Sequence, residues 1–334
     1  MKDYQPAKQM VQAPTIEAPT RPNTFPNYPS LGTPLSRMSS NSEKSLGLKS
    51  EKKKIGILGL GSIGSRHYRN FKELGCEVLG YDSHRPANAF DRQYVINWAD
   101  AIAVATPTEQ HGNDIIDCLV AQKPMFVEKP IHGANAALSD GDLGILMVGY
   151  NLRFHSCVKK AKEWMGIGKI GKPLWARFTC AQFNNKPDYL RDGVILNWSH
   201  EIDLALYLLG DAKLVAGSHN TEESLADLCL YHSTINCHTM VHLDYLTKHE
   251  RRGFLIVGEY GAIEADLVKR ELYHKNNLGH NADSFYGRDS FDGNYITEAQ
   301  AFLDRLEGKE ALGCTAEEAM AVVKICLEAK RCGQ

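Results

Sequence analysis

The stretch that decides the fold is residues 55–64, which read IGILGLGSIG. Its first four residues are mostly apolar and are typical of a short buried strand. The spacing G-x-G-x-x-G follows, and residues 62–74 then show the pattern of a helix that ends at Gly75. Strand, glycine-rich turn and helix in this order predict a loop whose backbone cradles a phosphate group.

The three glycines of this loop have different roles. Gly59 permits the tight turn, Gly61 lets the backbone approach a pyrophosphate, and Gly64 allows the helix to pack closely on the strand. The unpaired N–H groups where the helix begins, at Ser62 and Ile63, carry the positive end of the helix dipole toward the anion. We therefore expect a dinucleotide site here.

Asp82 supports this expectation. It ends a second apolar run, residues 77–81, at the place where a carboxylate accepts hydrogen bonds from the ribose hydroxyls of a dinucleotide. The same carboxylate would repel a 2′-phosphate, so NAD is favoured as the cofactor, and NADP, which Arg85 could accommodate, is the less favoured one. A purely structural alternative is that Asp82 only starts the turn at residues 83–86.

Further strands and helices alternate after Asp82. The apolar runs predict strands at 101–105, 125–127 and 145–148 and a helix around 115–120. Because the link from Asp82 to residue 101 is short, we expect 94–98 to be an abbreviated strand. The fold class is α/β, and residues 51–150 are predicted to form a shortened Rossmann domain with a doubly wound parallel sheet.

A different pattern begins after Tyr150. Long strands joined by short polar links predict a largely antiparallel sheet, which with its helices makes residues 151–334 a substrate-binding α/β domain. We expect helices near 158–165, 199–209, 296–306 and 316–329, and strands at 174–183, 227–231, 234–245, 253–257 and 262–267.

Residues 1–50 differ from the rest of the chain. They hold seven of the thirteen prolines, many Ser and Thr, and no periodic apolar pattern, so they are predicted to be a disordered tail. A mitochondrial transit peptide is a weaker alternative, since Asp3 and Glu17 are acidic and arginines are few. A tether or interaction arm without chemistry is the simplest interpretation.

Composition narrows the class of protein. The 38 Lys and Arg against 40 Asp and Glu give a net charge of −2, which does not favour nucleic-acid binding. The nine cysteines are scattered and never spaced as C-x-x-C, which argues against disulfides and zinc and fits a reducing cytoplasm. No apolar run approaches the roughly 18 residues of a membrane span. We expect a cytoplasmic protein without a metal.

Several motifs together resemble the Gfo/Idh/MocA family of oxidoreductases, over about residue 53 to the end. The family-like segments are the glycine loop, Ala105-Thr106-Pro107-Thr108 with His111, Glu128-Lys129-Pro130, Gly149-Tyr150 with Arg153-Phe154-His155, and Ser199-His200-Glu201-Ile202-Asp203. The resemblance implies NAD(P)-dependent oxidation or reduction of a hydroxyl carbon in a sugar or nucleotide-linked sugar. It also implies a homo-oligomer.

By the same resemblance, Lys129 contacts the substrate and His200 is the acid/base histidine. The chemistry agrees, because dehydrogenating a secondary alcohol needs a group that takes the hydroxyl proton and a positive charge beside the developing alkoxide. The remaining positions are assigned to the cofactor at Thr106, Pro107, His111 and Glu128, and to the substrate at Arg153, Tyr189, Asn197 and Asp203.

The chain departs from the family at one important place. Many members carry an Asp four or three residues before the histidine, where this chain has Leu196 and Asn197. Asn197 can hydrogen-bond His200 but cannot stabilise an imidazolium by charge, so the histidine would be a weaker base or would recruit Asp203 or Asp192. The alternative function is a non-catalytic nucleotide-binding descendant of the family that acts as an interaction or regulatory protein.

Removal of residues 1–50 should leave the thermal stability of the chain almost unchanged, because a segment with so little apolar surface contributes little to any core. The measurement is a melting curve of the shortened chain beside that of the full one. A melting temperature lower by many degrees would contradict the prediction of a disordered tail.

Overall fold

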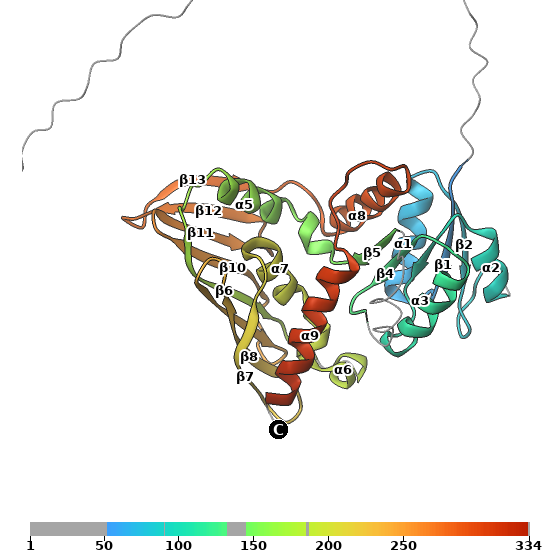
Figure 1. Ribbon diagram of the computed structural model, residues 1–334, viewed down its shortest axis with the longest axis horizontal. Helices are drawn as coiled ribbons and strands as arrows, with labels where there is room; N and C mark the ends of the chain where they lie inside the picture. The colour runs from blue at the N-terminus through green and yellow to red at the C-terminus, as the bar shows by residue number, and fades with distance from the viewer. Residues whose placement is uncertain (1–51, 90, 132–144, 185–186, 333–334) are drawn as a thin grey trace, which may run out of the picture. The chain divides into compact units, whose positions relative to one another are not determined.

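The computed structural model describes residues 52–89, 91–131, 145–184 and 187–332, with the side chains of 187–191 and 291 left out. The predicted tail, residues 1–50, lies outside these ranges. Among the described residues no helix combines the length and the apolar character needed to cross a membrane. The helices and strands are labelled in Figure 1.

A parallel sheet of five strands contains the glycine loop. Its order is β2-β1-β3-β4-β5, and every neighbouring pair is parallel. The strands are β1 (Lys54–Leu58), β2 (Glu77–Tyr81), β3 (Ala101–Val104), β4 (Met125–Glu128) and β5 (Leu146–Gly149), with helices α1 (Ser62–Glu73), α2 (Arg92–Trp98) and α3 (His111–Val120) and the 3-10 turn η1 (Thr108–Gln110) between them. The predicted parallel Rossmann sheet is confirmed.

The expected strand at 94–98 is wrong, because these residues lie in the helix α2. The Asp91 side chain caps this helix by accepting the Tyr94 N–H at 2.5 Å, and Val95 and Ile96 are fully buried. Both β2 and β3 run parallel to β1, so the chain has to cross back to the start of the sheet between them. A helix makes this crossing while satisfying its own backbone groups. The short segment between β2 and β3 thus forms a helix at the place where a strand was expected.

Helices from distant parts of the chain cover the two faces of this sheet. Apolar side chains of α2 and α3 bury one face. On the other face, Phe71 of α1 and Phe302 of α8 (Phe291–Leu306) meet Phe126 of β4, with the rings of Phe302 and Phe126 5.9 Å apart. Figure 1 shows α8 beside α1. A helix close to the end of the sequence thus completes the core of the first sheet.

The second sheet has eight strands in the order β13-β12-β11-β10-β6-β9-β8-β7. Only β6 and β9 run parallel, and all other neighbours are antiparallel. This confirms the predicted, largely antiparallel sheet, while β7, β12 and β13 were not foreseen. The strands are β6 (Pro173–Ala181), β7 (Lys213–His219), β8 (Leu225–His232), β9 (Cys237–Asp244), β10 (Arg251–Gly258), β11 (Gly261–Asp266), β12 (Glu271–Asn276) and β13 (Asn281–Tyr286).

Four helices and a 3-10 turn accompany the second sheet. They are η2 (Asn151–Phe154), α5 (Ser156–Gly166), α6 (Pro187–Asn197), α7 (His200–Leu209) and α9 (Ala316–Cys332). Helix α7 is the most buried of them at its start, where Ser199, Glu201 and Asp203 are each at most 1% exposed. A buried carboxylate must be paired to be tolerated, and both of these are.

Two arginines hold the first turn of α7. Arg153, 2% exposed on η2, donates to Asp203 from Nε at 3.1 Å and from Nη2 at 2.6 Å, and its Nη1 reaches Glu318 of α9 at 2.8 Å. Arg252 of β10 binds Glu201 with Nε at 2.7 Å and Nη2 at 3.1 Å. Both pairs are of the two-pronged kind that fixes orientation as well as distance.

Replacing Asp203 with Ala should lower the free energy of unfolding by about 3–5 kcal/mol, because it leaves the buried Arg153 guanidinium without its main partner. Glu318→Ala is the matched control, since that side chain is 46% exposed and should cost at most about 1 kcal/mol. Urea denaturation of both variants measures the difference. Equal losses would show that the buried pair is not the anchor that its geometry indicates.

Candidate active site

A crevice of about 880 Å³ lies at the carboxyl edge of the parallel sheet. This is where doubly wound folds bind their ligands. Its walls include the glycine loop, the ends of β2, β3 and β4, and residues from α6, α7, α8 and β10. Most of the residues singled out in the sequence therefore line one cavity, although they lie far apart along the chain.

The glycine loop has the shape that a pyrophosphate requires. Gly59 has φ of +87°, and a Cβ there would lie 2.6 Å from the Ala105 carbonyl oxygen. A Cβ on Gly64 would lie 1.9 Å from the Gly59 oxygen, so Gly64 serves helix packing and does not line the crevice. Gly61, by contrast, faces open space and has no side chain capping α1, which leaves backbone N–H groups at Ser62 and Ile63 at the crevice wall.

Asp82 both starts the turn and faces the crevice. Its Oδ2 accepts the Leu60 N–H at 2.7 Å, and its Oδ1 accepts those of His84 at 2.8 Å and Arg85 at 3.0 Å. Partial burial acts to raise the pKa of Asp82, but these backbone donors outweigh it and the pKa is lowered. The carboxylate is therefore ionised and tied to the glycine loop, while it still borders the cavity.

Contacts of the Thr106 and His111 side chains hold the loop after β3 in place. Thr106 Oγ1 donates to Asp114 at 2.5 Å. The ring of His111, 1% exposed, lies between two carbonyl oxygens, with Nε2 2.8 Å from that of Thr106 and Nδ1 3.0 Å from that of Pro130. Thr106, Pro107 and His111 all border the crevice, but the His111 nitrogens are occupied by the backbone. This histidine supports the wall and has no nitrogen left for a ligand.

Lys129 follows β4 and reaches across to the second part of the chain. Its Nζ donates to the main-chain oxygen of Asn197 at 2.7 Å, which leaves two of the three ammonium protons for other acceptors. Burial lowers the pKa of Lys129; Glu128 opposes this change and Arg252 adds to it. The Asn197 side chain donates to the Gly193 oxygen at 3.1 Å.

His200 lies on the same crevice and is 9% exposed. The ring of Tyr150 packs edge-on against it, with the centroids 5.6 Å apart. Burial, followed by the charges of Lys129 and Arg252, lowers the pKa of His200 well below its usual value, so the imidazole is neutral at pH 7. Its Nδ1 is buried without a hydrogen-bond partner among the described residues, which leaves Nε2 as the nitrogen that can meet a substrate.

Two predicted substrate contacts need correction. Arg153 and Asp203 do not line the crevice, because each satisfies the other in the buried pair that anchors α7. Asp203 therefore is not recruited by His200 either, whereas Asp192 does border the crevice. The side chain of Tyr189, also expected to contact substrate, lies outside the described residues.

The sequence analysis missed several residues of the wall. Arg252 of β10, Tyr295 of α8 and Gln182 after β6 border the crevice, and none belongs to a recognisable local motif. Their partners are remote in sequence: Arg252 pairs with Glu201 on another element. The topology of the second sheet brings Arg252 and Gln182 to the cavity, and the packing of α8 on the first sheet brings Tyr295 there.

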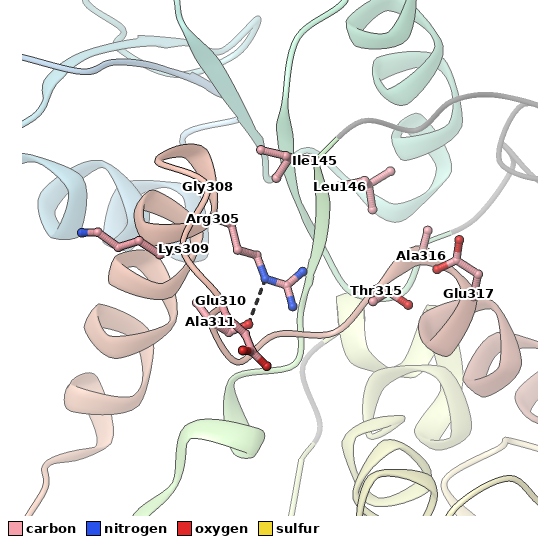
Figure 2. Close-up of a pocket in the computed structure, with 10 residues that line it drawn as sticks. All are labelled: Ile145, Leu146, Arg305, Gly308, Lys309, Glu310, Ala311, Thr315, Ala316 and Glu317. Atoms are coloured by element: carbon pink, nitrogen blue, oxygen red, sulfur yellow. Dashed lines mark hydrogen bonds between the residues drawn. The ribbon is translucent and has the colours of Figure 1, made fainter.

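A second, more open cavity of about 560 Å³ lies between the start of β5 and the link from α8 to α9. In Figure 2 the Arg305 side chain spans it, and its Nε donates to the Ala311 oxygen at 3.1 Å. None of the residues predicted for the cofactor or the substrate lines this cavity, so the first crevice is the candidate active site.

The fold and the crevice define an α/β protein with a Rossmann-like sheet and a second, mostly antiparallel sheet. Residues 34–121 match the family model described as D-isomer specific 2-hydroxyacid dehydrogenase, NAD binding domain. The chain is 30% identical over 194 residues to myo-inositol 2-dehydrogenase of Thermotoga maritima, which covers 47% of this chain and 55% of that protein. It is 28% identical over 188 residues to scyllo-inositol 2-dehydrogenase (NAD(+)) of Bacillus subtilis, with 46% and 53% covered.

The chain thus matches about half the length of these two curated relatives. The solved structure of UDP-N-acetylglucosamine 3-dehydrogenase from Acidithiobacillus ferrooxidans has a TM-score of 0.73 and covers 84% of this chain and 98% of its own. At 18% identity this likeness concerns the fold alone. Together the matches confirm the resemblance to the Gfo/Idh/MocA oxidoreductases.

Replacing Lys129 with Met should raise the pKa of His200, because it removes a positive charge that disfavours the imidazolium. Titration of the His200 ring by NMR, in wild type and variant, measures the change. Lys123→Met is the control, since its ammonium binds the Ala99 oxygen and does not line the crevice. An unchanged midpoint in Lys129→Met would show that the two groups do not interact.

Proposed function

We propose that this chain is an NAD-dependent dehydrogenase acting on a hydroxyl carbon of a cyclitol, a sugar or a nucleotide-linked sugar. The observation that carries the proposal is that one crevice joins an open glycine loop and an ionised Asp82 to Lys129 and His200. A dinucleotide fits this loop, because Gly61 leaves room and the start of α1 has no side-chain cap. The named activities of the relatives support the same reaction class.

The cofactor, when bound, supplies or accepts the hydride, and the chain supplies the rest. His200, neutral at pH 7, takes the hydroxyl proton on Nε2 during oxidation and returns it during reduction. The Lys129 ammonium stabilises the alkoxide that develops on the same oxygen. The main-chain oxygen of Asn197 holds Lys129 in place for this, and the Tyr150 ring restrains the imidazole.

His200→Ala and Lys129→Met should each lower turnover by roughly 10² to 10⁴ and leave cofactor affinity nearly intact. The assay follows reduced nicotinamide during a screen over cyclitols, sugars and nucleotide sugars, and fluorescence titration reports NADH binding. The loss in His200→Ala should shrink at high pH, where solvent removes the proton.

Binding of NADH without turnover on any substrate of these classes would overturn the proposal. It would instead favour the non-catalytic nucleotide-binding protein considered as the alternative. Activity that survives both substitutions would show that other residues move the proton.

Asp82→Ala should narrow the preference for NAD over NADP, because it removes both the acceptor for the ribose hydroxyls and the charge that repels a 2′-phosphate. The measurement is the ratio of the two dissociation constants. Asp100→Ala, which removes a carboxylate that binds Lys54 N–H away from the crevice, is the control. Equal or tighter binding of NADP by the unchanged protein would refute the assignment of Asp82.

A further inference from the structure

A buried histidine lies directly behind the predicted catalytic lysine. His67, one turn beyond the glycine loop on α1, is 1% exposed and does not line the crevice. Its Nε2 lies 2.7 Å from Oε1 of Glu128, and the other carboxylate oxygen accepts the Lys129 N–H at 3.3 Å. Glu128 does line the crevice. The chain of contacts thus runs from helix α1 through Glu128 to the backbone of Lys129.

The ring of His67 is held by other rings. Its centroid lies 4.9 Å from that of Phe126 and 6.2 Å from that of Tyr295, both approached edge-on, and 6.4 Å from that of Phe71. The carboxylate in turn has little space, since a Cβ on Gly149, its neighbour on β5, would lie 3.1 Å from Oε1. Both members of the pair are therefore confined to one arrangement.

Packing alone does not account for a histidine at this position. Its Nδ1 is buried and has no hydrogen-bond partner among the described residues, so the ring carries a desolvated nitrogen that an apolar side chain would not. The Nε2 contact is the one polar interaction that the structure describes for the ring. The contact is a hydrogen bond to a carboxylate when the ring proton is on Nε2, because a carboxylate can only accept.

We propose that His67 is a positioning residue for Lys129: its Nε2–H fixes the Glu128 carboxylate, whose other oxygen accepts the Lys129 N–H, and so keeps that carboxylate beside the lysine. The proposal rests on the proposed function only in its assumption that Lys129 stabilises the alkoxide of the substrate. The bond that matters is the 2.7 Å contact between α1 and β4.

The charges around Lys129 agree with this role. Burial and Arg252 of β10 disfavour a positive charge at Lys129, whereas Glu128 and Glu201 of α7 favour it; Cys326 of α9 also faces the lysine. Of the two acids, Glu201 is bound by Arg252 through both oxygens, which offsets its charge.

Helix α8 carries a second buried acid, Glu298, whose pKa is affected by the charge of Glu128. Glu298 is fully buried, and desolvation, followed by the charges of Glu128 and Asp203, raises its pKa well above the usual value. Burial thus favours the protonated form of Glu298. Arg66, which lines the crevice nearby, is paired with Asp292 at 3.0 Å and lies over the Tyr295 ring. Of the two described carboxylates whose charges act on Lys129, Glu128 is therefore the one that is not paired with Arg252.

Competitive acetylation of the cofactor-free protein tests the proposal without relying on activity. The rate of labelling of Lys129 by acetic anhydride is followed against pH by mass spectrometry, and the variants are His67→Phe, which removes the donor, and His67→Gln, which restores one. The midpoint for Lys129 should fall by about one pH unit in His67→Phe and return toward the wild-type value in His67→Gln. Phe71→Leu is the control, because it loosens the same core without touching Glu128.

An unchanged midpoint in His67→Phe, or an equal shift in Phe71→Leu, would overturn the proposal. If His67→Phe does not fold, a long-range ¹H–¹⁵N spectrum of the wild-type histidines decides the matter: the proton must be on Nε2 of His67, and a proton on Nδ1 alone contradicts the role. In active enzyme the basic limb of kcat/KM should move to lower pH in His67→Phe. A chain that transfers no hydride would refute the proposed function but leave the labelling result valid.

Discussion

Helix α7 is held on both sides of His200 by buried arginine–carboxylate pairs, and the geometry of the crevice depends on this constraint. Glu201 and Asp203 leave the helix in directions that flank His200, about 100° away on one side and about 60° on the other. Each is clamped by an arginine from a different element, Arg252 of β10 and Arg153 of η2. The helix can neither rotate nor slide without separating a buried ion pair, so His200 is held at the crevice.

The same arrangement determines the charge of the site. Burial of the His200 ring, together with the charges of Lys129 and Arg252, keeps the imidazole neutral, which is the form that can take a proton. Many relatives are expected to orient this histidine with a carboxylate, and here Asn197 occupies that place while its side chain binds the Gly193 oxygen. The histidine is therefore kept neutral by burial and by neighbouring cations, and it packs against Tyr150, with no acid on its Nδ1 among the described residues.

Local patterns predicted the parts of the molecule that depend on neighbours in sequence. The glycine loop, the apolar strands of the first sheet and the helix near 199–209 could all be located, because each is encoded within about ten residues. The failures have a common cause. Residues 94–98 contain apolar side chains at a spacing that suits either a short strand or a short helix, and the need to cross the sheet decided for the helix.

Long-range pairing limited the prediction of the site in the same way. Arg153 and Asp203 have the residue types of a substrate-binding pair, yet they are 50 positions apart and satisfy each other. Arg252 was missed because its place at the crevice depends on the register of β10 with β6. Polar residues in an α/β fold can thus be recognised from sequence as important before it is known whether they face a ligand or one another.

The packing of α8 on the first sheet has a consequence for how the chain folds during synthesis. When the ribosome has made the five parallel strands, one face of that sheet still lacks Phe302 and its neighbours, which are translated some 150 residues later than β5. An apolar sheet face that is not yet covered by a helix is prone to non-native association. The dinucleotide half therefore keeps one apolar face of its sheet uncovered until α8 has been made, and its core is completed only together with the substrate half.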